Sequence, residues 1–458
     1  MNDWVRAEHH AEKADRLLQA GRCVQALREW RQAVAMNPYQ GRWQLYLGRT
    51  LETLGRYREA LNAYERACEL LGEDVESMLC LAVGWIREGR PRRALQQLRR
   101  IHELDPGYEP AYCHEIAAHV RLGDHHSAEV AFYLARQLVE RCPTCYDHIA
   151  RSHALRGNLQ QAVRCWEQAM CLKPRAGGIA ANLARSYWQL GRRNTALAMF
   201  EHHLRAQPFD AESMLQCACL LLELGKHASA RRLLEHVSEL DPACAEAHLH
   251  LGEIALSAGK PETAAYELQH AARLDPRLPM VRLRLAQLSL KRGLRDDAVR
   301  QLEVELDQPP IRRAAQVLDL GATLVACGLV EPAALVLTEL IDRPDSHDLS
   351  REVLAAARLY RSQAWLSLGR HRPAIRDCRA ALRVDPLFVP AMRQLAAAHF
   401  QLRQLRRAGY WLDRARLHQP EDSRLRRLRR RLRRRVWGRR LYHAVCMLTA
   451  PLSGGRSV

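Results

Sequence analysis

Two cysteines in the string Cys142-Pro143-Thr144-Cys145 have the spacing best suited to chemistry. They stand where a helical pattern begins, and the positive end of a helix dipole lowers the pKa of a thiol placed there. His148 follows one turn later and would share their face, so a redox pair or a partial metal site is one interpretation. The chain has no second Cys-x-x-Cys and no βαβ pattern around this one, which favours structural cysteines without a metal.

Other strings that imitate catalytic motifs fail on spacing. The histidines His114 and His119 flank a glutamate in the manner of a zinc protease, but they are five residues apart instead of four. At about 100° per residue the two rings diverge by roughly 140° on a helix and do not share a metal. Gly225-Lys226 and Gly259-Lys260 lack the first glycine of a P-loop. We therefore predict no catalytic residue, no metal and no cofactor, and a protein that is not an enzyme.

The elements that hold these residues follow from an internal repeat. Glycine recurs every 34 residues, and an alanine follows each glycine after five. The glycines are Gly21, Gly55, Gly89, Gly123, Gly157, Gly191, Gly225, Gly259 and Gly293. The alanines are Ala26, Ala60, Ala94, Ala128, Ala162, Ala196, Ala230, Ala264 and Ala298. A proline often lies seventeen residues after the glycine, for example Pro38 and Pro106.

Each position in the repeat has a physical reason. Apolar residues recur at helical spacing before each glycine, and the glycine ends that helix in a left-handed conformation. The alanine lies inside the next helix, where its small side chain lets two helices approach closely. The proline stops the second helix because it has no N–H to donate. Each unit is thus a helix–turn–helix hairpin that stacks on its neighbours.

This pattern resembles the tetratricopeptide repeat (TPR). Nine residues of the second unit match its signature: Gln44, Leu47, Gly48, Leu51, Gly55, Tyr57, Ala60, Tyr64 and Ala67; Gly72 replaces the usual proline. Twelve units begin near residues 7, 41, 75, 109, 143, 177, 211, 245, 279, 314, 355 and 389. The resemblance implies an all-α, right-handed superhelical solenoid of TPR-like helix–turn–helix hairpins.

The repeat is interrupted near its end. Extra residues fall in the polar stretch from Arg343 to Glu352, read either as a surface insertion or as a hinge. We expect repeats 1–10 in residues 1–347, repeats 11–12 in 348–420, and an Arg-rich helix and tail in 421–458. Arg403 occupies the place of the turn glycine in repeat 12.

The composition and the lack of targeting signals predict where in the cell the chain resides. Fourteen cysteines scattered through helical patterns, no secretory segment and no run of 18 apolar residues predict reduced thiols and a soluble, cytoplasmic protein. The 70 Lys+Arg against 51 Asp+Glu give a formal net charge of +19. Twelve arginines and two acidic residues lie in 421–458, so the tail holds +10 of that charge.

The resemblance also implies a concave groove lined by positions 2, 5, 9, 12 and 13 of each unit, which binds partner proteins or peptides. We predict a groove that is basic, then acidic, then apolar, and that selects its partner by charge. Its basic residues are Arg42, Arg49, Arg87, Arg121, Arg151 and Arg185, interspersed with Glu52, Glu76 and Asp147. Its acidic residues are Glu212, Glu223, Glu246 and Glu253, and its apolar residues include Leu318, Ala322, Val325 and Leu366. The alternative is that these are ordinary solvated helix faces.

The tail has three interpretations. Leu425, Leu428, Leu432 and Val436 form the apolar stripe of an amphipathic helix. The stripe would cap repeat 12, or the arginines Arg426, Arg427, Arg430, Arg431 and Arg434 would dock on an anionic membrane or on nucleic-acid phosphates. We predict a non-catalytic protein-binding scaffold or adaptor; the alternative is a peripheral membrane- or nucleic-acid-associated assembly factor. No small-molecule substrate is expected.

Overall fold

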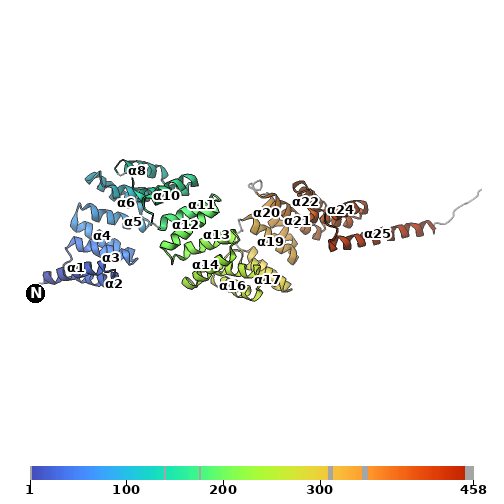
Figure 1. The fold of residues 1–458 in the computed structure, drawn as a ribbon, viewed down its shortest axis with the longest axis horizontal. Coiled ribbons are helices and arrows are strands. Elements are labelled where there is room, and N and C mark those ends of the chain that lie inside the picture. The colour runs from blue at the N-terminus through green and yellow to red at the C-terminus, as the bar shows by residue number, and fades with distance from the viewer. Residues whose placement is uncertain (1–2, 139–140, 175–176, 308–312, 343–348, 449–458) are drawn as a thin grey trace, which may run out of the picture. The chain divides into compact units, whose positions relative to one another are not determined.

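The computed structural model describes residues 3–138, 141–174, 177–307, 313–342 and 349–448 (Figure 1). Within these ranges the chain forms helices α1 to α25 and no strand. The predicted all-α fold is confirmed. None of the described helices combines the length and the hydropathy that a membrane crossing requires. The chain divides into two compact units, residues 1–233 and 234–458, and the division falls inside α14, His227–Leu240.

The first unit is a series of helix hairpins that follow one another along the chain. Its helices are α1 Asp3–Gln19, α2 Cys23–Met36, α3 Gly41–Thr53, α4 Tyr57–Leu71, α5 Val75–Arg87, α6 Pro91–Leu104, α7 Glu109–Leu122, α8 His125–Leu138, α9 Pro143–Leu155, α10 Leu159–Leu172, α11 Gly177–Gln189, α12 Arg193–Ala206 and α13 Ala211–Glu223. The odd-numbered helices α3 to α13 begin at the residues predicted as the starts of repeats 2–7, whereas α1 begins at Asp3, four residues before the predicted start of repeat 1.

The second unit continues the same pattern. Its helices are α15 Ala245–Ser257, α16 Pro261–Leu274, α17 Val281–Lys291, α18 Arg295–Leu306, α19 Ala314–Cys327, α20 Val330–Asp342, α21 Arg351–Ser367, α22 His371–Val384, α23 Val389–Gln401, α24 Leu405–His418 and α25 Ser423–Leu448. The polar stretch predicted as a loop is shorter than expected, because Arg351 and Glu352 already belong to α21. Ser350 caps that helix by accepting a hydrogen bond from the Val353 N–H. The rest of the stretch, 343–348, lies outside the described residues.

The turn glycines have the conformation that the repeat requires. All nine have φ between 69° and 79°, a left-handed region in which a side chain is strained. Arg403 takes the same place in the last hairpin with φ of 56°, so this turn is the strained member of the series.

The small residues bring the two helices of a hairpin together. The nine alanines of the repeat are all buried. A Cβ added to Gly48 of α3 would lie 2.5 Å from the ring of Tyr64 in α4, so only glycine allows this approach. Gly252 and Gly321 face Leu268 and Leu337 in the same manner in later hairpins. Helix packing in each unit therefore depends on a repeated small-against-large contact.

The first helices of successive hairpins pack more closely on one another than the second helices do. In the first unit α5 contacts α7, and α7 contacts α9. In the second unit, contacts of this kind connect α15, α17, α19, α21 and α23 in order. This is the packing that the predicted groove on the first-helix side requires, and the groove itself stays a prediction.

The tail helix α25 closes the end of the second unit. Leu425 and Leu432 are buried and Leu428 is half-buried, and all three pack on the core formed by α23 and α24. These are the contacts that a capping helix requires, and the choice between a cap and a docking tail stays a prediction; the side chain of Val436 lies outside the described ones.

Candidate partner-binding hollow

A hollow of about 640 Å³ lies on the first-helix side of the second unit. We call it the C-terminal hollow. Its lining residues come from α19, α21, α23 and α25: Val325, Gln363, Leu366, Ser367, Arg393, Gln394, Ala397, Gln401, Arg424, Arg427, Leu428 and Arg431. Val325 and Leu366 are two of the apolar groove residues predicted from the sequence. Gln363 and Ala397 occupy the ninth position of repeats 11 and 12, another predicted groove position.

The tail helix forms one wall of the C-terminal hollow. Arg424, Arg427 and Arg431 are spaced by three and four residues, so they share a face of α25 with Leu428. The buried side chains of Leu425 and Leu432 fix the rotation of the helix on α24 and thereby direct this face toward the hollow. The apolar end of the groove predicted from repeats 10–11 thus ends at a basic wall, which the positional rule for repeats did not include.

The guanidinium groups of this wall are available. Arg393 bonds Asp422 at 3.1 Å, but no described residue forms a hydrogen bond or ion pair with the side chains of Arg424, Arg427 and Arg431. All three are exposed. A guanidinium binds a carboxylate through two parallel hydrogen bonds, so this wall can hold acidic side chains of a partner.

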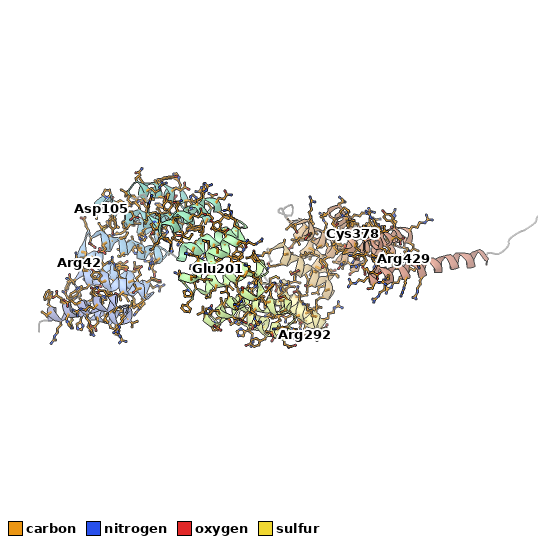
Figure 2. The ribbon with its side chains drawn as sticks, in the orientation of Figure 1. Arg42, Asp105, Glu201, Arg292, Cys378 and Arg429 are labelled. Carbon is orange, nitrogen blue, oxygen red and sulfur yellow. The ribbon has the colours of Figure 1, made fainter. Side chains whose placement is uncertain are left out.

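The other tail arginines lie elsewhere. Arg426 bonds Glu421 at 2.9 Å, while Arg430 and Arg434 are exposed and do not line the hollow. Arg429, labelled in Figure 2, lies 3.5 Å from Asp413 of α24. The five arginines predicted as a basic tail therefore divide into two that line the hollow, Arg427 and Arg431, and three that do not.

In the first unit, half of the predicted basic groove residues are engaged in ion pairs. Arg49 pairs with Glu76 of α5, and Arg87 pairs with Glu52 of α3. Arg151 bonds both carboxylate oxygens of Asp147, and the other hydrogen bond to Asp147 Oδ1 comes from the Trp166 indole at 2.8 Å. These acidic partners are the residues that interrupted the basic pattern in the sequence. Most of the pairs connect first helices of neighbouring hairpins.

The other predicted basic residues differ from one another. Arg42, labelled in Figure 2, and Arg121 are exposed, and no described residue pairs with either side chain. Arg185 is half-buried, and its Nε atom is buried without a hydrogen-bond partner among the described residues. Only Arg42 and Arg121 thus have the availability seen at Arg427 and Arg431.

The predicted acidic residues are partly satisfied by neighbours within their own units. Glu223 accepts hydrogen bonds from Trp188 Nε1 at 2.9 Å and Arg193 Nε at 3.2 Å. Glu212 accepts one from Gln216 at 3.1 Å, and Glu246 is exposed.

Glu253 belongs to a charge network that connects three first helices. Arg284 of α17 bonds Glu253 of α15 at 2.7 Å and Asp319 of α19 at 3.2 Å. Burial alone would raise the pKa of Glu253, but the hydrogen bond from His250 and the positive charge of Arg284 outweigh it, and the pKa lies below its ordinary value. Arg284 stabilises the carboxylate, so this part of the surface is less acidic than its sequence suggests.

Cys142 and Cys145, the cysteine pair noted in the sequence, lie close to two further side chains. Cys142 caps the start of α9 and Cys145 lies in its first turn, and both approach Cys113 and Glu109 of α7. Hydrogen bonds with the Cys113 and Cys145 side chains lower the pKa of Cys142. His148 is not part of the group; burial lowers its pKa to about 4. His119 is largely buried, and its ring nitrogens lie 3.7 Å from Glu115 and 3.5 Å from Asp124.

Tetratricopeptide repeat models match this chain in four segments, residues 12–75, 144–173, 179–212 and 215–279. The chain belongs to the tetratricopeptide repeat family. The family is generally a non-catalytic, protein-interaction fold, so a protein-interaction scaffold is the function that this membership supports in general. No curated protein sequence matches the chain.

Several solved structures are similar to this tetratricopeptide repeat chain. A thermophilic tetratricopeptide repeat protein of Thermus thermophilus is 27% identical and covers 40% of this chain and 99% of its own, with a TM-score of 0.38. PilF of Pseudomonas aeruginosa is 20% identical over 44% of this chain and 92% of its own, with a TM-score of 0.41. The Cut9–Hcn1 complex of APC/C is 14% identical over 93% of this chain and 96% of its own, with a TM-score of 0.47.

Sequence reasoning missed several residues of this tetratricopeptide repeat protein. Arg393 holds the fifth position of repeat 12, a groove position, and a complete listing of those positions would have included it. Arg424 lies in the tail, and only the packing of α25 places it at the hollow. Arg284 occupies the sixth position of repeat 9, which the positional rule does not contain.

Proposed function

We propose that the protein is a non-catalytic scaffold that holds a segment of a partner protein against the first helices of its second unit. The segment has acidic side chains that bind Arg427 and Arg431, next to apolar side chains that contact Val325 and Leu366. The observation that carries this proposal is the set of unpaired arginines at one wall of a hollow lined by predicted groove positions. An acidic partner would supply the carboxylates that no described residue supplies.

A charge-zoned groove remains part of the proposal in a reduced form. Arg42 and Arg121 are the members of the six predicted basic groove residues that are exposed and have no partner among the described residues, and they would add contacts to an acidic partner in the first unit. Arg49, Arg87 and Arg151 are already paired, so they would orient neighbouring helices and contribute little to partner binding.

The test is a selection from a peptide library on the intact chain. Peptides enriched on the unaltered protein are measured against the double variant Arg427→Glu/Arg431→Glu and the matched control Arg430→Glu/Arg434→Glu. Both variants change the same helix by the same charge, but only the first alters the C-terminal hollow. We expect acidic peptides to be enriched and to bind the first variant at least tenfold more weakly. Peptides without acidic bias, or equal loss on both variants, would contradict the proposal.

A second candidate, docking of the tail on an anionic membrane or nucleic acid, is supported by the exposed Arg430 and Arg434 outside the hollow. Here the two variants exchange roles. Binding to anionic vesicles or to RNA would fall, and lose part of its salt dependence, in Arg430→Glu/Arg434→Glu more than in Arg427→Glu/Arg431→Glu. Equal binding by these two variants at low and moderate salt would exclude this candidate.

A further inference from the structure

Four metal-binding side chains converge between the first helices of repeats 4 and 5. Glu109 and Cys113 are four residues apart on one face of α7, while Cys142 and Cys145 stand at the start of α9. Their ligand atoms all lie within 4.8 Å of one another. Cys113 Sγ is 3.2 Å from Cys142 Sγ and 3.1 Å from Glu109 Oε1. Donors from two helices therefore meet at one point.

We propose that Glu109, Cys113, Cys142 and Cys145 form a structural zinc site that fastens α7 to α9. Zinc in proteins takes four ligands in a tetrahedron, chiefly thiolates, imidazoles and carboxylates, and Cys-x-x-Cys is a usual ligand pair. With Zn–S bonds of about 2.3 Å, sulfurs in such a tetrahedron are roughly 3.8 Å apart. The Cys113 and Cys142 sulfurs are 3.2 Å apart, slightly closer than this, and no two of the four ligand atoms are more than 4.8 Å apart, so a small outward shift of the side chains would accommodate the ion. On binding, the three thiols release three protons to solvent and the carboxylate of Glu109 completes the set.

The surroundings suit a closed, structural site. Cys113 and Cys145 are buried, Cys142 and Glu109 are half-buried, and the apolar side chains of Ile116, Phe132 and Ile149 belong to the same core cluster. With all four positions filled by protein groups and apolar residues around them, no position remains for a substrate or water. The metal would hold the two helices together and would have no catalytic role.

The repeat supplies its own comparison for this site. The places of Cys113, Cys142 and Cys145 are filled by Leu79, Tyr108 and Ala111 one repeat upstream, and by Leu45, Asp74 and Ser77 two repeats upstream. In the latter junction Asp74 simply caps α5 by accepting the Ser77 N–H at 2.8 Å. The fold thus forms this junction without sulfur, and three cysteines together need a reason other than packing. A disulfide would use two of them and leave the third cysteine and Glu109 unexplained.

The test measures metal in the intact chain after reconstitution with Zn²⁺, and the spectrum after replacement by Co²⁺. We expect one zinc per chain, and a cobalt spectrum with thiolate charge transfer and the intense visible bands of tetrahedral coordination. Cys142→Ser should weaken Zn²⁺ binding at least tenfold. Its matched control is Cys244→Ser, since Cys244 caps α15 at the same place in the repeat and has no part in the cluster. Loss of binding in the control, or no zinc above that of a zinc-free blank, would overturn the proposal.

Two further measurements do not depend on whether a cysteine variant folds. In the unaltered chain, Zn²⁺ should protect Cys113, Cys142 and Cys145 from alkylation, as read by mass spectrometry, and should leave exposed Cys171 reactive. Glu109→Gln keeps all three sulfurs, and it should retain the thiolate band of the cobalt protein while weakening Zn²⁺ binding about tenfold. Equal alkylation with and without Zn²⁺, or a disulfide among the three cysteines in protein isolated without oxygen, would overturn the site.

Discussion

Two hollows in the second unit are lined by arginines, but they differ in what those arginines contact. The C-terminal hollow has Arg393, Arg424, Arg427 and Arg431, of which only Arg393 has a described side-chain partner. The other, of about 540 Å³ and formed by α16, α17 and α18, has Arg273, Arg282, Arg292 and Arg300. Each of these four side chains already bonds to a described residue: Gln269, Gln301, Glu262 and Asp297.

This difference shows that the number of arginines at a surface does not identify a binding site. Both hollows contain polar and apolar groups and four basic residues. Of the two hollows, only the C-terminal one has guanidinium groups with no hydrogen-bond partner among the described residues, and so a partner protein can bind them there without breaking an internal bond. Arginines that already pair with a residue of the chain should therefore affect stability more than binding, each by an amount set by its burial.

The largest effect is expected at the buried pair of Arg361 and Asp377. Arg361 Nε and Nη2 donate to the two oxygens of Asp377 at 2.8 and 2.7 Å, and the side chains are 15% and 7% exposed. Asp377→Ala leaves the guanidinium buried without its partner, and we expect a loss of about 3–5 kcal/mol in the free energy of unfolding.

Urea denaturation of the intact chain measures this loss, in the unfolding transition of the second unit, which contains the pair. The control is Asp413→Ala, which removes the exposed partner of Arg429 and should cost less than about 1 kcal/mol. A similarly small loss for Asp377→Ala would mean that the buried pair of Arg361 stabilises the fold no more than the exposed pair of Arg429.

A smaller effect is expected at Glu253, half-buried beside Arg284. Glu253→Gln removes a charge-assisted hydrogen bond and should cost about 1.5–3 kcal/mol at neutral pH. Because the pKa of Glu253 is lower in the folded chain, its contribution is present above the ordinary value of 4.5 and is lost as the pH falls through the lower folded value. The unfolding free energies of the unaltered chain and the variant should converge below pH 4.5; a constant difference would contradict the shift.

An effect of about 1 kcal/mol on the free energy of unfolding is expected at Arg403, because its backbone takes a left-handed conformation. A left-handed conformation costs an ordinary residue roughly 1–2 kcal/mol, and glycine avoids that cost but loses more entropy on folding. Arg403→Gly should therefore stabilise the second unit by about 1 kcal/mol. Gly369→Ala, with φ of 71° at the equivalent turn, should destabilise it. Thermal unfolding of both variants checks the sign, and a destabilised Arg403→Gly would refute the argument.

The smallest effect is expected at the exposed pair of Arg49 and Glu76 in the first unit. The side chains are 40% and 53% exposed, so solvent screens the attraction and Arg49→Gln should cost between 0 and about 1 kcal/mol. Urea denaturation provides the value. A loss comparable to that of Asp377→Ala would show that exposed pairs in the first unit hold the helices together.

The fold could be predicted almost completely because its determinants are local and periodic. Glycine turns, buried alanines and helix starts recur every 34 residues, so an error at one repeat is corrected by the others. Val281 begins its helix two residues later than the period predicts, because Met280 before it takes a left-handed φ of 75°. The predicted division of the chain at residues 347 and 348 stays a prediction.

The candidate sites could be predicted only in part, because their remaining residues meet through tertiary packing. The apolar residues Val325 and Leu366 follow from repeat positions. The packing of Leu425 on α24 sets the rotation of α25, and this rotation decides which tail arginines line the hollow. Cys113 lies 29 residues before Cys142, a separation that no short motif contains. Comparing the same positions at successive repeat junctions would have found it.

The central claim, that the unpaired arginines of the C-terminal hollow bind an acidic partner, is tested most directly by calorimetric titration. One enriched acidic peptide is titrated into the unaltered chain, Arg427→Glu/Arg431→Glu and Arg430→Glu/Arg434→Glu. We expect Kd to rise at least tenfold, or about 1.4 kcal/mol, in the first variant and to change less than about twofold in the second. An unchanged Kd in the first variant, or a larger loss in the second, would contradict the claim.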